Sequence, residues 1–171
     1  YSPRQLLEVM VNLWSEHFNI WQRKEIDATL KTADDRDVIR KFALGKFRDL
    51  LGASAHSPAM LYYLDNVQSN KAHPNENYGR ELLELHTLGV GNYTEADVQN
   101  VAHAFTGWTI QGLKATDAGT FTFNPKLHDT AAKTVLGHTI PAGGGVEDGE
   151  KVLDILAVHP ATAKHIATIL A

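Results

Sequence analysis

The stretch that decides the fold runs from His73 to Trp108, HPNENYGRELLELHTLGVGNYTEADVQNVAHAFTGW. It predicts two helices joined by a tight glycine-rich turn. Asn75 is a good N-cap for the first helix, and Gly89 supplies the left-handed residue that ends it. Thr94 and Asp97 have the spacing of a capping box at the start of the second helix. The short connection predicts an antiparallel or steeply crossed helix pair.

Helical periodicity continues on both sides of this pair. Ser2, Pro3 and Gln5 carry the cap, proline and capping-box signals of a first helix. The further helices that we expect cover residues 3–18, 34 or 35 to 51 with an interruption at Gly45, 57–64, and 147 to the end with a break at His159-Pro160. Residues 19–33 lack clear periodicity, so we interpret them as a loop with room for one turn of helix. Asp34 or Asp35 is interpreted as the cap of the next helix.

Residues 108 to 140 have a different character. Thr109–Leu113 and Thr120–Phe123 are rich in β-branched and aromatic residues and predict a small hairpin, with Lys133 to Ile140 as a third short strand. Pro141 to Gly145 is interpreted as a flexible loop. The fold class that we predict is mainly α, a helical bundle-like domain with a small β-hairpin insertion around residues 108–140.

Composition limits the possible functions. The 171 residues predict one domain, and the absence of cysteine excludes disulfides, thiolate metal sites and a cysteine nucleophile. The formal net charge is −4, and residues 75–107 carry five acids against Arg80 alone, which is the wrong sign for binding nucleic acid. No apolar run reaches the ~18 residues of a membrane helix, and no signal peptide opens the chain.

The sequence resembles a known family. The block ENYGRELLELHTLGVGNYTEADVQNVAHAFTGW, together with FTFNPKLHDTAAKTVLG and VLDILAVHPATAKHIA, is similar to the bacterial domain-of-unknown-function family numbered 1800. Ala131-Ala132 stand where the family often has Gly-Pro, and Trp14 to Phe18 lack the first of two histidines that the family often has there. The resemblance implies a largely helical bacterial protein, exported to the periplasm or outside the cell through a leader absent here, and it implies no activity.

The resemblance also bears on the ends of the chain. Family members are longer at both ends, and ATAKHIATILA stops in mid-pattern without a C-cap. We therefore expect residues 1–171 to be a single helical domain, a fragment truncated at both ends of a longer family domain.

The strongest candidate chemistry lies on the first helix of the central pair. Glu76, Arg80 and Glu84 are spaced four apart, so the arginine can be held from both sides. Paired carboxylates serve acid–base catalysis or hold a divalent metal through oxygen ligands when partners converge from another element. The alternative is a solvated helix face with intrahelical ion pairs.

A second candidate is His128-Asp129-Thr130 beside Lys133. An imidazole next to a carboxylate on a loop can act as a general base with an orienting group, although adjacent residues rarely point the same way and Asp-Thr is ordinary turn chemistry. His86 and His103, one on each helix of the pair, are expected to lie near opposite ends and not to meet. The sequence holds no Gly-x-Ser-x-Gly elbow, Walker loop or dinucleotide fingerprint.

Two functional hypotheses follow. The favoured one is a structural or partner-binding module whose surface binds a protein of the cell envelope. The alternative is a hydrolase-like enzyme, with or without the assistance of a divalent metal, whose catalytic residues are Glu76, Glu84, His128 and Asp129, with Arg80 as an electrostatic clamp. No cofactor is implied by a motif, and the sequence identifies neither a substrate nor an oligomeric state.

Overall fold

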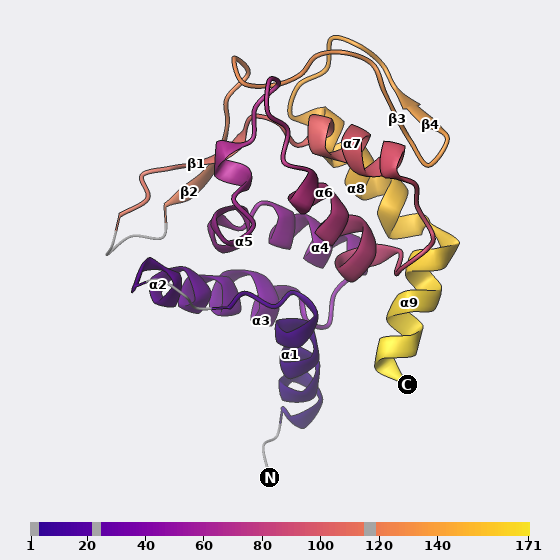
Figure 1. Cartoon of the computed structure of the whole chain (residues 1–171). Coiled ribbons are helices and arrows are strands. Elements are labelled where there is room, and N and C mark those ends of the chain that lie inside the picture. Colours follow the sequence, from indigo (N-terminus) through magenta and orange to yellow (C-terminus); the bar gives the residue numbers. More distant parts are fainter. Residues whose placement is uncertain (1–3, 22–24, 115–118) are drawn as a thin grey trace.

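The computed structural model describes residues 4–21, 25–114 and 119–171 and shows a mainly α-helical domain with two small antiparallel sheets (Figure 1). The α-helices are α1 (Gln5–His17), α2 (Glu25–Asp34), α3 (Arg40–Phe42), α4 (Phe47–Ala55), α5 (Pro58–Tyr63), α6 (Glu76–Glu81), α7 (Glu95–Ala104), α8 (Glu147–Val158) and α9 (Pro160–Leu170). The other helical turns are π-helical η1 (Asp35–Ile39), 3₁₀-helical η2 (Asn66–Gln68) and π-helical η3 (Leu82–Thr87). The predicted fold class is confirmed.

The first half of the chain corrects one prediction. Residues 25–34 form α2 and continue directly through η1 into α3, so the loop expected over 19–33 is wrong for this part. Asp34 does not cap a helix, because α2 continues through this position into η1 and the side chain makes no cap hydrogen bond. The Asp34 carboxylate instead accepts a hydrogen bond of 2.6 Å from the Ser57 hydroxyl. Leu30 is buried, and packing against α5 therefore supplies a stability that local periodicity does not show. The Ser2 and Pro3 signals lie outside the described residues.

The central helix pair forms as predicted. The Asn75 side chain accepts a hydrogen bond of 3.0 Å from the Tyr78 amide, and Thr94 and Asp97 make both bonds of a capping box. Gly89 has a φ of 79°, the left-handed conformation expected of it. The first helix differs in one respect, because it widens into η3 after Glu81 and so loses regular α spacing before its end.

Two glycines allow close packing, one within this helix pair and one between α8 and Trp108. A Cβ on Gly79 would lie 2.7 Å from the Val98 carbonyl oxygen of α7, and a Cβ on Gly149 would lie 2.5 Å from the Trp108 ring. Trp108 has no exposed surface, and its ring packs against that of Phe105 in the core with centroids 4.7 Å apart. The closest helix contacts and the largest buried ring therefore both require a residue without a side chain.

The β structure consists of two separate hairpins. β1 (Trp108–Gln111) pairs with β2 (Thr120–Phe123), while β3 (Lys133–Val135) pairs with β4 (His138–Ile140). The third strand expected over residues 133–140 is therefore two strands. They are joined by Leu136 and Gly137, whose φ values of 50° and 79° are those of a tight primed turn.

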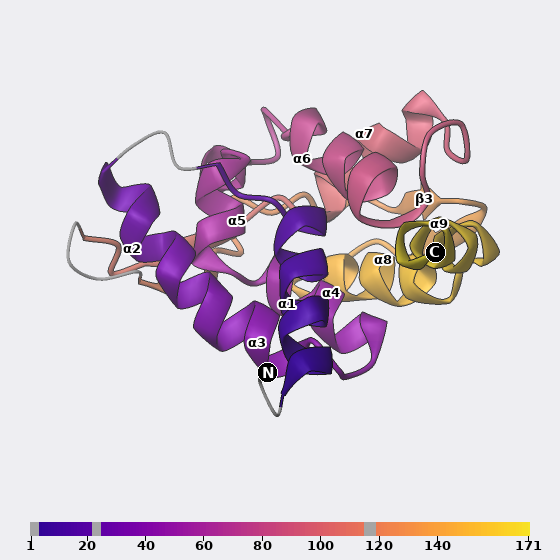
Figure 2. The ribbon, with the colours of Figure 1, turned by 90° about the horizontal axis from the view of Figure 1, so that it is seen from below.

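The first and last long helices project from the same side of the domain. α1 and α9 extend downward from the body in Figure 1, and Figure 2 looks onto this side. α9 packs on α8 and η3, and α1 packs on η1. Among the described residues no helix has both the length and the apolar character needed to span a membrane.

Gly79 gives a test of the helix packing. Gly79→Ala adds a Cβ against backbone atoms of α7, and overpacking of this kind typically costs about 1–3 kcal/mol, more than the ~1 kcal/mol that alanine gains as a helix former. We expect urea unfolding to show a net loss of stability. Gln99→Ala on the exposed face of α7 is the control and should leave stability unchanged. An alanine variant as stable as the wild type would contradict the close helix contact.

Candidate functional site

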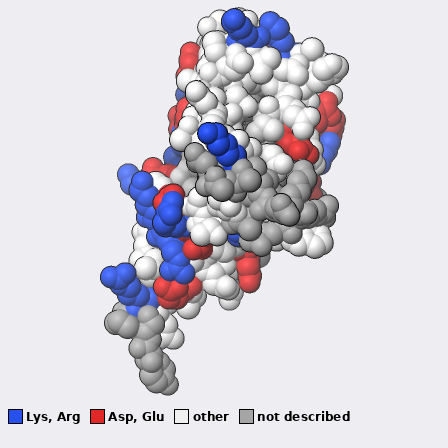
Figure 3. All heavy atoms as spheres, turned by 90° about the vertical axis from the view of Figure 1, so that its left-hand side faces the viewer, with Lys and Arg blue, Asp and Glu red and all other residues white. Residues whose placement is uncertain are grey.

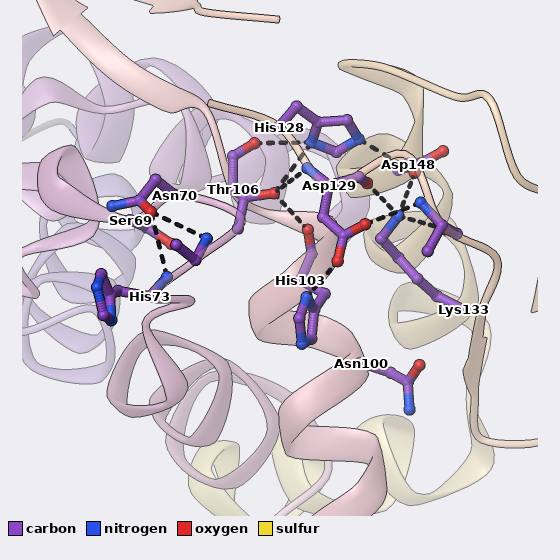
Figure 4. Close-up of polar contacts among 12 residues, drawn as sticks. Ser69, Asn70, His73, Asn100, His103, Thr106, His128, Asp129, Lys133 and Asp148 are labelled. Atoms are coloured by element: carbon purple, nitrogen blue, oxygen red, sulfur yellow. Dashed lines mark hydrogen bonds and ion pairs between the residues drawn. The ribbon is translucent and has the colours of Figure 1, made fainter. Parts of the chain in front are cut away.

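The densest polar network lies where the His-Asp-Thr segment crosses the start of α8 (Figure 4). The Asp148 carboxylate accepts a hydrogen bond of 2.8 Å from the Lys133 ammonium, and the same oxygen lies 3.2 Å from His128 Nε2. These three side chains are only 1–3% exposed. A charge buried so deeply is stable only when it is paired and hydrogen-bonded.

The loop before α8 is shaped around Asp148. A Cβ on Gly144 would lie 1.9 Å from Asp148 Oδ1, so only glycine leaves room for the carboxylate. The Gly143 amide donates a hydrogen bond of 2.8 Å to the Thr130 carbonyl, which ties the loop to the His-Asp-Thr segment. The glycine run that we interpreted as flexible therefore has a specific packing role.

Lys133 closes the network from β3. Its ammonium also donates to the carbonyl oxygens of Asp129 at 2.6 Å and Ala131 at 2.8 Å. All of its hydrogen bonds are thus made to protein oxygens in the buried interior. The residue holds a sharp turn of backbone together and is not available to a substrate.

Thr106, at the end of α7, links this network to the helix. His128 Nδ1 lies 2.8 Å from the Thr106 carbonyl oxygen, and the Thr106 hydroxyl accepts a hydrogen bond of 2.9 Å from the Asp129 amide. The hydroxyl in turn donates to the His103 carbonyl at 2.6 Å. His128 and Asp129 are consequently fixed in opposite directions, one inward and one outward.

Asp129 points to His103 of α7. His103 Nδ1 lies 2.5 Å from Asp129 Oδ2 in a close charge contact rather than an aligned hydrogen bond, and the two side chains are 36% and 21% exposed. Burial raises the pKa of Asp129, but the Ala131 amide, His103 and Lys133 together outweigh burial and leave it lowered. An aspartate that orients a partly exposed imidazole is the geometry of a general base, and this role stays a hypothesis.

Two further side chains of α7 hold the same segment. Asp97 Oδ1 accepts a hydrogen bond of 2.7 Å from the Leu136 amide, and Asn100 Oδ1 accepts one of 3.1 Å from the Thr134 amide. Asp97, Asn100 and His103 are spaced three apart and so lie along one face of the helix. This face forms a row of polar contacts to residues 129–136.

The residues Glu76, Arg80 and Glu84, which the sequence predicts to pair with one another, have other partners in the structure. Arg80 pairs with Glu95 at 2.7 Å, across the turn between the helices, so the expected grip by Glu76 and Glu84 is wrong. For Glu84 the reason lies in η3, whose wider turn moves residue 84 out of the row above residue 80. Glu76 keeps regular spacing to Arg80 within α6, but the guanidinium pairs with Glu95 of the next helix instead. Glu84 instead accepts a short hydrogen bond from the Tyr93 hydroxyl, and Glu76 is exposed at the start of α6.

The structure therefore brings together only part of the predicted set. His128, Asp129 and Lys133 share one network, whereas no hydrogen bond or ion pair of the described residues joins them to Glu76, Arg80 or Glu84. In the described part of the chain, no three His, Asp or Glu side chains are grouped to hold a metal ion. The catalytic role of the predicted residues stays a hypothesis.

Sequence reasoning missed Asp148 and Thr106 and did not connect His103 with Asp129. The signal for His103 is its spacing from Asp97 and Asn100, which places three polar side chains in one row beside the buried face of the helix. The sequence signal for Asp148 is weak. A carboxylate in the first turn of a helix is common, because it interacts favourably with the helix dipole whether or not it has another role.

A groove of about 590 Å³ lies between α1, η3 and α9. Four apolar and four polar residues line it: Val9, Asn12, Leu13, Glu16, His17, Leu85, His165 and Ile169. Val9 and Leu85 are 57% and 50% exposed, which is high for apolar residues that surround one depression.

Two imidazoles at this groove contact the end of η3. His17 Nε2 lies 3.0 Å from the His86 carbonyl oxygen, and His165 Nε2 lies 3.2 Å from the carbonyl oxygen of Leu85. The His17 and His165 ring centroids are 6.1 Å apart. Both walls of the groove therefore reach adjacent carbonyls of one helix end, which have no partner within their own helix.

His86 is buried beneath the groove beside Phe18. Burial, with a smaller contribution from His17, lowers the pKa of His86 to about 3. Among the described residues no hydrogen bond or ring contact joins this histidine to His103, and His86 is buried in the core.

The fold and network define a class: a mainly α-helical domain with a β segment fixed to it by a buried ion pair. The model of the family described as "Protein of unknown function (DUF1800)" matches residues 1–171, so the chain belongs to this family. The resemblance stated from the sequence is confirmed. No curated protein and no solved structure matched the chain.

Asp148→Asn tests the buried ion pair. The substitution leaves Lys133 charged and buried without its counter-charge, and loss of one partner of such a pair typically costs about 3–5 kcal/mol. We expect a loss of at least about 3 kcal/mol in chemical denaturation, and partial recovery in Asp148→Leu combined with Lys133→Met. Asp154→Asn, at a 57% exposed carboxylate on the same helix, should cost under about 1 kcal/mol. Equal losses of stability in Asp148→Asn and Asp154→Asn would show that the buried ion pair contributes no more than an exposed one.

His86 gives a prediction for pH. Its pKa is lowered to about 3 in the folded state, so below its ordinary value of 6.5 the unfolded chain binds a proton that the folded chain does not. Stability from this group is therefore lost as pH falls, by about 2 kcal/mol between pH 7 and 5. Unfolding of His86→Leu should lack this part of the pH dependence, and His138→Leu, at an exposed position, should retain it. Identical pH slopes in all three proteins would refute the assignment.

Proposed function

We propose that this domain is a partner-binding module that takes an amphipathic helix of another protein into the groove between α1 and α9. The observation that carries the proposal is the groove of about 590 Å³, around which exposed apolar side chains from three elements converge. Val9 comes from α1, Leu85 from η3 and Ile169 from α9. Helix-in-groove recognition uses this combination of an apolar depression and spaced apolar anchors on the ligand.

Charge at the groove narrows the chemistry of the partner. Glu16 lines the groove, is exposed and forms no ion pair among the described residues; its carboxylate accepts only a long hydrogen bond of 3.4 Å from Asn12. A lysine or arginine beside the apolar stripe of the partner helix would supply the missing counter-charge. We therefore infer a basic amphipathic helix as the occupant.

The proposal also covers where the partner is found. The family resemblance supports an exported bacterial protein, and on that basis the partner is a protein of the cell envelope. On the face shown in Figure 3, basic side chains lie close to acidic ones. The ion pairs of Arg40 with Glu8 and Asp35 are contacts of this kind. Mixed charges, together with the formal net charge of −4, argue against nucleic acid as the partner.

The test uses a labelled peptide of about 18 residues with leucines at helical spacing, as groove anchors require, and lysines along one edge of the apolar stripe. Fluorescence anisotropy should show saturable binding that a scrambled peptide of the same composition does not show. Val9→Ser with Ile169→Ser removes two anchors, and we expect binding to weaken at least tenfold, or about 1.4 kcal/mol.

Val158→Ser is the matched control, because Val158 is 82% exposed at the end of α8 and does not line the groove. Equal weakening by the control, or equal binding of the scrambled peptide, would refute the groove as the site. Sedimentation of the protein alone tests the other occupant: a dimer that Val9→Ser with Ile169→Ser dissociates would overturn the assignment to a second protein.

A further inference from the structure

A second cavity, of about 240 Å³, lies away from the groove and from the polar network. It is formed where α2 passes into η1, at the start of α5 and beside the β1–β2 hairpin. Its lining comprises Leu30, Ala33, Asp34, Arg36, Asp37, Val38, Ser57, Pro58, Ala59 and Gly119. Neither functional hypothesis drawn from the sequence involves these residues.

Asp34 is the polar group on which this cavity depends. The residue is 3% exposed, and its Oδ1 accepts the 2.6 Å hydrogen bond from the Ser57 hydroxyl. The other oxygen, Oδ2, is buried and has no hydrogen-bond partner among the described residues. A buried carboxylate oxygen without a donor is costly, and such groups are rare in folded proteins.

The electrostatics of Asp34 agree with this geometry. Burial raises the pKa of Asp34, and the opposing effects of the Ser57 hydrogen bond and the Lys31 charge do not compensate for it. Lys31 lies one turn earlier on α2, and its ammonium is likewise buried without a hydrogen bond among the described residues. The two opposite charges thus act on each other through space but leave the acceptor at Oδ2 unfilled.

Arg36, the basic residue that lines the cavity, does not supply the missing hydrogen bond either. It donates two hydrogen bonds, of 2.8 and 2.6 Å, to the Asp37 carboxylate, and among the described residues it makes none to Asp34 Oδ2. A hard divalent cation is a poor occupant, because it needs about six oxygen ligands and the cavity offers one free carboxylate oxygen. What the cavity lacks is a compact N–H donor, preferably one that carries a positive charge.

We propose that this cavity is a binding site for a small organic ammonium ion, whose N–H groups donate to Asp34 Oδ2 while its carbon chain lies against Leu30, Val38 and Ala59. At about 30 Å³ for each water in the liquid, the volume equals roughly eight waters, which suits an amine of about five to eight heavy atoms. The charge matters because an ionised donor pairs with the buried carboxylate as a neutral hydroxyl cannot.

The experiment titrates the whole chain with n-butylammonium chloride and follows amide shifts by NMR, with 1-butanol as the neutral isostere and sodium chloride as the ionic-strength control. We expect saturable shifts at Asp34, Ser57 and Ala59, and an affinity at least tenfold higher for the ammonium than for the alcohol. Equal affinity, or no saturable shift at these amides, would overturn the proposal.

Asp34→Asn removes the charge while keeping an acceptor for Ser57, and it should abolish the tenfold preference. Asp35→Asn is the matched control at the next position, where the carboxylate pairs with Arg40 instead of lining the cavity, and it should retain the preference. Retention of the preference in Asp34→Asn would refute the site.

A second measurement needs no variant and so remains decisive if Asp34→Asn fails to fold. Carboxyl-carbon NMR of the wild-type chain gives the pKa of Asp34 directly. Saturating n-butylammonium should lower it, because the bound cation favours the carboxylate form, whereas an unchanged pKa would show that the cation does not contact Asp34.

Discussion

The carboxylate of Asp148 meets the ammonium of Lys133 in the interior of the protein, and the arrangement of the second half of the chain depends on this contact. Lys133 begins β3 and Asp148 lies in the first turn of α8, so the pair joins the hairpin segment to the helical body. Removal of both charges from water is expensive, and the carbonyls of Asp129 and Ala131 help to offset the cost. Those same hydrogen bonds turn the backbone so that His128 faces the core and Asp129 faces α7.

The outer face of α7 complements this buried pair from the solvent side. Asp97 has two tasks, because one of its oxygens completes the capping box of its own helix while the other receives the Leu136 amide. Asn100 and His103 continue the row toward Thr134 and Asp129. The helix thus both buries its apolar face against α6 and presents a polar face that fixes an irregular segment.

Local chemistry explains which features were predictable from the sequence. Asn75, Gly89 and the Thr94–Asp97 box act within four residues of the helix ends that they define, so a sequence pattern is enough to place them. α2 was missed because the contacts of Leu30 and Asp34 are with α5, more than twenty residues later. Its stability comes from packing, which periodicity in a single segment does not report.

The candidate site likewise combines residues that the sequence identifies with partners that only the fold brings near. The sequence identified His128, Asp129 and Lys133 as a polar cluster, but it could not show that two adjacent residues point to different partners. Asp148 and His103, which supply those partners, are separated from His128 and Asp129 by 20 and 26 positions. The predicted pairing of Arg80 with Glu76 and Glu84 failed for two other reasons. The π-helical turn of η3 changes the angle between successive residues and displaces Glu84. Arg80 pairs with Glu95 of α7, a partner that spacing within one helix cannot show.

The end of η3 has a mechanical consequence for the groove. His17 of α1 and His165 of α9 each reach the backbone of this one turn, at the carbonyls of His86 and Leu85. The helices α1 and α9 are therefore both attached to adjacent carbonyl groups of η3. A small rotation of η3 would move both helices together, so η3, which belongs to neither helix, sets the width of the groove between them.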